Sequence, residues 1–202
     1  MNAVEKKSQG MLIVLSAPAG CGKDTIVQGL LNSDADIKNE LNLFYSISAT
    51  TRNIRFGEEE GKHYFFMSKE KFEKLIEEGE FLEYTKYCGN YYGTRRKTIM
   101  NALKEGKNII LKIECEGAEN VKKMFPDAVT IFVLPPSVSE LRRRLFKRAT
   151  ECECVIDERI AKAMTEIAKC DEYDYRVTND VLQTAIEEVA AIIRSERDKR
   201  SI

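Results

Sequence analysis

The stretch GMLIVLSAPAGCGKDT, residues 10–25, decides how this chain folds. It begins with an apolar run from Met11 to Leu15, which has the length of a buried strand. Gly20 and Gly22 then allow the backbone to turn its N–H groups toward an anion, and Lys23 adds a positive charge where a helical pattern begins. This order predicts a loop that binds the phosphates of a nucleotide. Its members are Ala17, Pro18, Ala19, Gly20, Cys21, Gly22, Lys23, Asp24 and Thr25.

Two positions depart from the usual pattern G-x-x-x-x-G-K-[ST]. Ala17 stands at the first glycine, and Asp24 replaces the hydroxyl that normally touches magnesium, while Thr25 supplies a hydroxyl one residue later. We therefore expect a Mg²⁺ ion to be held through the nucleotide phosphates, with Asp24 and Thr25 as the candidate protein ligands. The alternative is an ordinary β–α turn that binds nothing, which the ordered succession of strand, glycines, lysine and helix disfavours.

Composition restricts the class of protein. The 202 residues suffice for one substantial core with an inserted unit and a lid. Lys and Arg number 32 against 33 Asp and Glu, so the net charge of −1 predicts neither a nucleic-acid nor a membrane surface. Apolar runs reach only about five residues, too short for a membrane span or a signal-peptide core. The six cysteines form no C-x-x-C framework, and we expect a cytoplasmic protein; oligomeric state is not predicted.

Strand-like and helix-like patterns alternate along the chain. Strands are expected at Met11–Leu15, Phe44–Ser46, Ile109–Ile113, Val129–Leu134 and Tyr175–Thr178. Helices are expected at Asp24–Asn32, Thr94–Glu105, Ala118–Phe125, Val138–Lys147, Asp157–Ile167 and Leu182–Arg197. This alternation predicts an α/β fold in which a parallel sheet is covered by helices on both faces.

Two segments interrupt the alternation. Ser46–Tyr92 is rich in aromatic residues and contains strand patterns at His63–Met67 and Phe81–Lys86 around a helical pattern at Lys69–Glu78, which predicts an inserted α+β unit. Arg142–Arg159 carries several arginines, a pattern that is also typical of a solvated helix face.

Residues 50–66 carry the pattern T-T-R-x-x-R-x-x-E-x-x-G-x-x-Y-x-F, which resembles the signature of the guanylate kinase family at every position. The likeness extends from about Gly10 to Arg197 and includes GNYYGT at residues 89–94, LPPS at 134–137 and VTND at 177–180. It implies a P-loop NTPase core at 10–45 and 94–200, an inserted GMP-binding domain at 46–93 and a short lid at 140–160. Residues 1–9 are expected to be a flexible N-terminus.

The signature also has a chemical reading of its own. Arg52 and Arg55 can both donate to one phosphate, and Tyr64 adds a hydroxyl, so the three fit a phosphomonoester dianion. The resemblance implies that this is the phosphate of GMP, with Tyr92 as a further donor. The alternative is that the two arginines merely pair with the acidic residues 58–60.

Guanine selection requires acceptors for N1–H and N2–H₂ and a donor for O6. The resemblance assigns these roles to Glu83, Glu114, Ser48 and Thr94. Without the resemblance, Glu83 would be interpreted as an ordinary exposed strand residue.

The resemblance implies transfer of the γ-phosphoryl group of ATP to GMP, and to dGMP, giving ADP and GDP for purine nucleotide synthesis. Such a reaction depends on cations and positioning, and the expected catalytic residues are Lys23, Arg144, Arg148 and Arg159. Arg142 and Arg143 are expected to face solvent. The main alternative is a guanylate-kinase-like binding module with weak or lost catalysis. A kinase for another acceptor is disfavoured by the guanine-selecting set.

The segment ILKIE, residues 110–114, departs from the family, whose members usually read Asp-x-Asp where this chain has Lys112 and Glu114. Strand alternation would place both side chains on one face. Because Asp24 introduces a negative charge and Lys112 a positive one, we predict that the two form an ion pair beneath the nucleotide. Cys21 lies at a helix N-terminus beside Lys23, a position that lowers a thiol pKa; the alternative is an inert packing residue, as most buried cysteines are.

Overall fold

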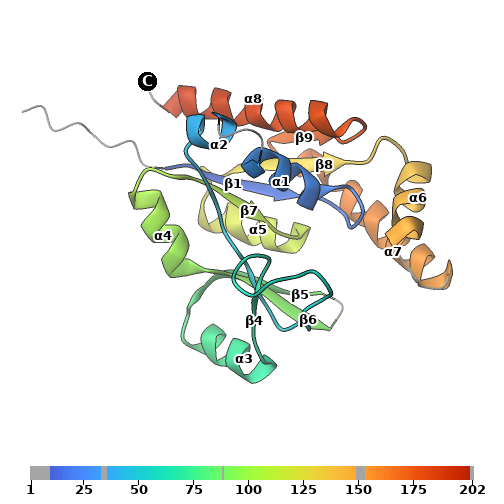
Figure 1. Ribbon diagram of the computed structural model, residues 1–202, viewed down its shortest axis with the longest axis horizontal. Coiled ribbons are helices and arrows are strands. Elements are labelled where there is room, and N and C mark those ends of the chain that lie inside the picture. Colours follow the sequence, from blue (N-terminus) through green and yellow to red (C-terminus); the bar gives the residue numbers. More distant parts are fainter. Residues whose placement is uncertain (1–9, 33–35, 88, 149–152, 201–202) are drawn as a thin grey trace, which may run out of the picture.

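A computed structural model describes residues 10–32, 36–87, 89–148 and 153–200 of the chain. The described strands form two sheets, one of five strands and one of four (Figure 1). Residues 1–9, for which a flexible N-terminus is predicted, lie outside the described ranges.

The larger sheet is entirely parallel, as the alternating pattern predicts. Its order is β2-β7-β1-β8-β9, with β1 at the centre. Leu12 of β1 is paired with Ile109, and Ile13 with Val129, so both neighbours run alongside the strand that leads into the phosphate loop. The strands are β1 (Leu12–Ser16), β2 (Leu43–Tyr45), β7 (Asn108–Lys112), β8 (Val129–Leu134) and β9 (Tyr175–Thr178).

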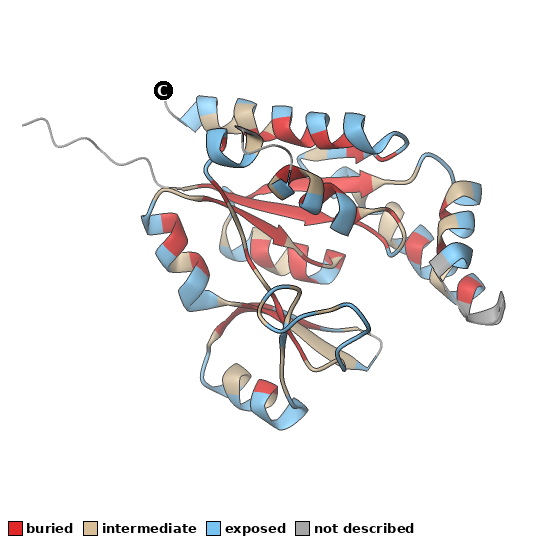
Figure 2. Cartoon of the chain, in the orientation of Figure 1, coloured by how far each residue is buried: buried red, intermediate tan, exposed pale blue. Residues whose placement is uncertain are grey.

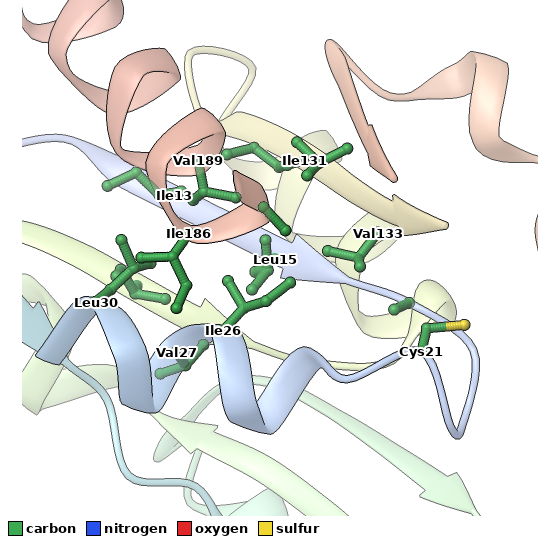
Figure 3. Close-up of a cluster of buried hydrophobic side chains, with 14 of the residues drawn as sticks. Ile13, Leu15, Cys21, Ile26, Val27, Leu30, Ile131, Val133, Ile186 and Val189 are labelled. Atoms are coloured by element: carbon green, nitrogen blue, oxygen red, sulfur yellow. The ribbon is translucent and has the colours of Figure 1, made fainter. Parts of the chain in front are cut away.

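Helices cover both faces of this sheet because successive side chains of β1 point in opposite directions. Ile13 and Leu15 pack in one cluster with Ile26 and Val189 (Figure 3), whereas Val14 belongs to the cluster on the opposite face. The first face is covered by α1 (Lys23–Asn32), α2 (Asp36–Glu40) and α8 (Leu182–Arg200), and the second by α4 (Arg96–Lys104) and α5 (Cys115–Met124). The strands between these layers are buried (Figure 2).

Two further helices, α6 (Val138–Arg148) and α7 (Glu153–Ile167), follow β8 and lie beyond the carboxyl ends of the central strands (Figure 1). A short 3-10 turn, Cys170–Glu172, leads from α7 to β9. None of the helices within the described ranges is long and apolar enough to cross a membrane.

The smaller sheet has the order β4-β3-β6-β5 and packs against a helix. Phe72 of this helix is fully buried, and its ring stacks on Phe81 at 4.2 Å and on Tyr91 at 5.2 Å between centroids. Aromatic stacking therefore provides the core of this unit. Its elements are β3 (Ala49–Thr50), β4 (Phe65–Phe66), α3 (Lys69–Glu77), β5 (Phe81–Tyr87) and β6 (Asn90–Arg95).

Helices α5 and α7 begin three and four residues earlier than predicted, at Cys115 and Glu153, and the short helix α2 has no counterpart among the predicted helices. Two further differences concern the smaller sheet. The helix expected to begin at Thr94 begins at Arg96, because residues 90–95 pair as β6 with β5 and β3. The strand expected over His63–Met67 is reduced to Phe65–Phe66. In both places, pairing with segments distant in sequence overrides the local pattern.

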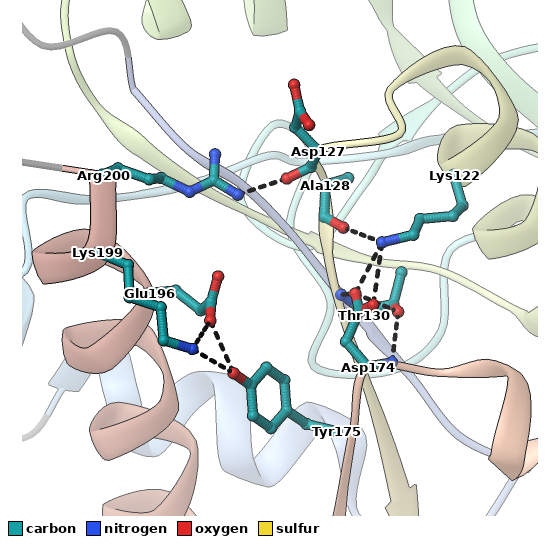
Figure 4. Close-up of polar contacts among 9 residues, drawn as sticks. All are labelled: Lys122, Asp127, Ala128, Thr130, Asp174, Tyr175, Glu196, Lys199 and Arg200. Atoms are coloured by element: carbon teal, nitrogen blue, oxygen red, sulfur yellow. Dashed lines mark hydrogen bonds and ion pairs between the residues drawn. The ribbon is translucent and has the colours of Figure 1, made fainter.

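A polar network lies at the amino ends of β8 and β9, away from the phosphate loop (Figure 4). The Asp174 carboxylate accepts hydrogen bonds from the Thr130 backbone N–H and from Lys122 Nζ, both at 2.8 Å. These bonds connect α5, β8 and the start of β9, and so fix the edge strand beside β8.

Candidate active site

The phosphate loop follows β1 at the carboxyl edge of the larger sheet and leads into α1. Gly20 and Gly22 have φ angles of +91° and +87°, in the left-handed region that favours glycine. Asn179, which follows β9, donates from its side-chain amide to the carbonyl oxygen of Cys21 at 2.8 Å. The loop is therefore shaped by its glycines and fixed from a distant strand end.

Lys23 is the first residue of α1, and its side chain turns back beneath the loop. Its Nζ donates to the carbonyl oxygens of Ala17 at 3.2 Å and Ile113 at 3.1 Å and lies 3.2 Å from Glu114 Oε1. The residue is only 9% exposed. These contacts hold an ammonium group at the helix N-terminus, where backbone N–H groups also favour an anion.

The Lys112 ammonium forms an ion pair with Asp24 in the first turn of α1, which confirms the predicted pairing. The Lys112 side chain is 12% exposed and the Asp24 side chain 58%. Burial lowers the pKa of Lys112, but Asp24 and two nearby tyrosines outweigh that effect and keep the pKa above its ordinary value.

The Lys112 and Glu114 side chains lie on one side of the chain, as predicted, although only Lys112 belongs to the strand. Strand β7 ends at Lys112, and Glu114 occupies the N-cap position of α5 in an extended conformation. Both side chains nevertheless reach the first turn of α1, where Lys112 contacts Asp24 and Glu114 contacts Lys23.

For Cys21 the lowered pKa is wrong, and the alternative of a packing residue is confirmed. The residue is fully buried against the core, and desolvation raises its thiol pKa to about 12, although Lys23 acts in the opposite direction. Loss of hydration outweighs the adjacent positive charge, so Cys21 is a packing residue of the loop (Figure 3).

The predicted acceptor-phosphate residues gather on the smaller sheet and its loops. Arg52 makes a two-pronged ion pair with Glu58, with nitrogen–oxygen distances of 2.8 and 3.0 Å, and this pair lowers the Glu58 pKa. Arg55 is exposed. The Tyr64 ring lies 5.5 Å from the Arg52 guanidinium carbon and 6.0 Å from the Tyr92 ring. Arg52 therefore pairs with an acidic residue of the segment 58–60, as the alternative interpretation predicts. The same two-pronged geometry also suits a phosphate group.

Glu83 is buried, whereas the sequence without the family resemblance predicts an exposed strand residue. It is 5% exposed, and its Oε1 accepts a hydrogen bond from Thr94 Oγ1 at 2.6 Å. Burial raises its pKa to about 7, although the Thr94 bonds oppose the shift. Ser48 is also buried, one residue before β3. The paired strands β5 and β6 therefore place the Glu83 carboxylate next to the Thr94 hydroxyl.

The predicted lid arginines lie on α6 and α7. Arg144 donates from Nε to Glu140 at 2.8 Å and from Nη2 to the Asn179 carbonyl oxygen at 3.0 Å, next to the phosphate loop. Arg159 is half-buried on α7. The Arg148 side chain lies outside the described residues. Arg142 and Arg143 are exposed, as expected.

The comparisons with known proteins agree with this arrangement. The guanylate kinase family model matches residues 9–196. The chain is 48% identical over 191 residues to the guanylate kinase of Carboxydothermus hydrogenoformans, covering 95% of this chain and 91% of that one. It is 46% identical to the guanylate kinase of Shouchella clausii, over 96% of this chain and 92% of that one.

The chain belongs to the guanylate kinase family. A crystal structure of guanylate kinase from Anaplasma phagocytophilum superposes with a TM-score of 0.75 at 32% identity, covering 94% of this chain and 87% of that one. The P-loop NTPase fold is thereby confirmed as well.

Asn179 is the site residue that the sequence reasoning left without a role. It lies in the segment VTND, which the resemblance to the guanylate kinase family includes, and it is buried. The available signal was a polar residue directly after a strand of a parallel sheet, at the edge where ligands bind.

Proposed function

We propose that the chain transfers the γ-phosphoryl group of ATP to GMP, giving ADP and GDP, and to dGMP, giving ADP and dGDP. The observation that carries this proposal is that the chain has two half-sites, one for the phosphates of ATP and one for the acceptor. The phosphate loop keeps a buried Lys23 at the N-terminus of α1, and the smaller sheet keeps a buried Glu83–Thr94 pair. A module that only bound a partner would not need the lysine.

Recognition of the acceptor divides into two parts. The Glu83 carboxylate is suited to accept hydrogen bonds from guanine N1–H and N2–H₂, and Glu114 and Ser48 add further polar groups. Arg52, with Arg55, Tyr64 and Tyr92, is suited to bind the phosphate dianion in place of the Glu58 carboxylate. Adenine presents an unprotonated N1 to the carboxylate and would be rejected.

Phosphoryl transfer then depends on positive charge and positioning. Lys23 would contact the transferring phosphates from the loop, while Arg144, Arg148 and Arg159 would neutralise charge from the side of α6 and α7. We propose that residues 46–93 hold the acceptor and that residues 140–160 close over the phosphates and exclude water.

Mg²⁺ fits the site through oxygen ligands. Asp24 and Thr25 place a carboxylate and a hydroxyl in the first turn of α1, which are donors that Mg²⁺ accepts. No group of three His, Cys, Asp or Glu side chains suited to a metal occurs in the described ranges, so most ligands would be phosphate oxygens and water. The bound ion would neutralise charge on the phosphates of ATP.

The test is a coupled assay of ADP release with Mg·ATP and GMP, dGMP, AMP, UMP or CMP. We expect GMP-selective turnover and a loss of roughly 10²-fold or more in kcat for Lys23→Ala, because this ammonium would stabilise transition-state charge. Lys97→Ala, at an exposed residue of α4, is the matched control and should keep wild-type turnover. GMP binding without turnover by the wild type would instead identify a binding module.

A further inference from the structure

The Lys112 ammonium lies between the two half-sites. It pairs with Asp24 on α1, and it lies 5.9 Å from the Tyr45 ring centroid and 5.5 Å from the Tyr64 ring centroid. Asp24 and Tyr45 belong to the elements around the larger sheet, whereas Tyr64 directly precedes β4 of the smaller sheet. One buried cation therefore contacts both parts of the molecule.

The Tyr64 ring is in turn part of the candidate acceptor site. The Arg52 guanidinium lies 5.5 Å from the centroid of the same ring, and the Tyr92 ring packs edge-on against it. Cations near an aromatic face are attracted by its quadrupole, and more strongly where water is excluded. The position of Lys112 thus bears on where Tyr64 and its neighbours lie relative to the phosphate loop.

We propose that Lys112 is a positioning residue that Asp24 holds in place, and that it fixes Tyr64 and the acceptor-phosphate site relative to the phosphate loop. This inference rests on the proposed function, in which Tyr64 and Arg52 bind the phosphate of GMP. The charges of Asp24 and Lys112, which differ from the family pattern, would then serve to align the acceptor.

The decisive variant is the double substitution Asp24→Asn with Lys112→Met. It removes both charges together, so the phosphate loop gains no unbalanced carboxylate, while the Tyr64 ring loses one of its two nearby cations and keeps Arg52. Calorimetric titration without Mg²⁺, so that the substitution of Asp24 cannot act through a bound ion, should show a GMP Kd raised about tenfold, the effect of one partly desolvated cation–π contact, and an ATP Kd changed by less than about threefold. A GMP Kd within about twofold of wild type, or an ATP loss as large as the GMP loss, would overturn the proposal.

Three further variants separate positioning from general stability. Lys112→Arg keeps the charge and should keep the GMP Kd within about threefold of wild type. Lys107→Met is the matched control: Lys107 precedes the other end of β7, pairs with Glu105 at 2.7 Å and lies 5.4 Å from the Phe44 ring, and its loss should leave GMP binding unchanged. Asp24→Asn alone alters a half-exposed side chain, and should raise the GMP Kd about threefold by releasing Lys112.

An unchanged GMP Kd in Asp24→Asn would contradict the proposal even if the double variant failed to fold. Wild-type turnover is measured first. If the wild type binds and phosphorylates GMP while the Lys112 variants bind it normally, the positioning role fails and the proposed function stands. If the wild type does not bind GMP, the proposed function itself fails.

Discussion

At the residue scale, Glu83 should make GMP binding depend on pH. Burial raises its pKa to about 7, whereas guanine requires the carboxylate form as an acceptor. GMP binding should therefore release a proton, and the GMP Kd should rise about tenfold between pH 8 and pH 6 from this group. Titration in buffers of different ionisation enthalpy measures that proton. Glu83→Gln should retain only the pH dependence of the nucleotide phosphate, and identical slopes for both proteins would contradict the assignment.

The same residue has a consequence for stability without ligand. The folded protein holds the Glu83 proton more tightly than the unfolded chain, whose ordinary value is 4.5. The contribution of Glu83 to the free energy of unfolding should therefore be greatest below pH 4.5. It should fall by an amount on the order of 3 kcal/mol as the pH rises through about 7. Urea unfolding of wild type and Glu83→Gln measures this difference.

At the scale of elements, the turn between β1 and α1 should tolerate no side chain at Gly22. Gly22 has a φ of +87°, and an added Cβ would lie 2.2 Å from Asn179 Nδ2. Asn179 would have to leave its bond to the Cys21 carbonyl oxygen. We expect Gly22→Ala to cost about 2 kcal/mol or more in unfolding free energy and to weaken ATP binding more than tenfold.

Gly79→Ala is the matched control for this element. Its φ is +68°, but no atom lies within 4 Å of the added Cβ, so only backbone strain of about 1 kcal/mol is expected. Urea unfolding and ATP titration of the two variants make the comparison. Equal losses of ATP affinity would show that the close approach of Asn179 does not matter.

At the scale of the whole molecule, GMP should stabilise the fold because its proposed site draws on residues from both sheets. At a GMP concentration of about 100 times Kd the gain is about 2.7 kcal/mol. For a chain of this length that corresponds to roughly 5–10 °C in Tm. Differential scanning fluorimetry with GMP, and with AMP as the control, measures it. An equal shift with AMP would contradict guanine selection by Glu83.

Much of the architecture is predictable from local patterns. The five strands of the larger sheet lie within a residue of their predicted positions because most of them are short apolar runs, while β9, with the sequence YRVT, is rich in residue types that favour strands. The Asp24–Lys112 pair was predictable from the opposite charges at two positions that the fold brings together. The division into residues 10–45 with 94–200 and 46–93, and the roles of the site residues, stay predictions.

By itself, the sequence determined the parallel sheet, the phosphate loop and the family, because strand length, glycine positions and the signature over residues 50–66 are local properties of the chain. Only the tertiary structure decided three matters at the site. Pairing of β5 with β6 placed Thr94 in a strand against Glu83. Burial gave Cys21 a raised pKa in place of a lowered one. The packing of α1, β2, β7 and the smaller sheet brought Asp24, Tyr45 and Tyr64 around Lys112. These outcomes depend on desolvation and on contacts between segments far apart in the chain, which no local pattern encodes.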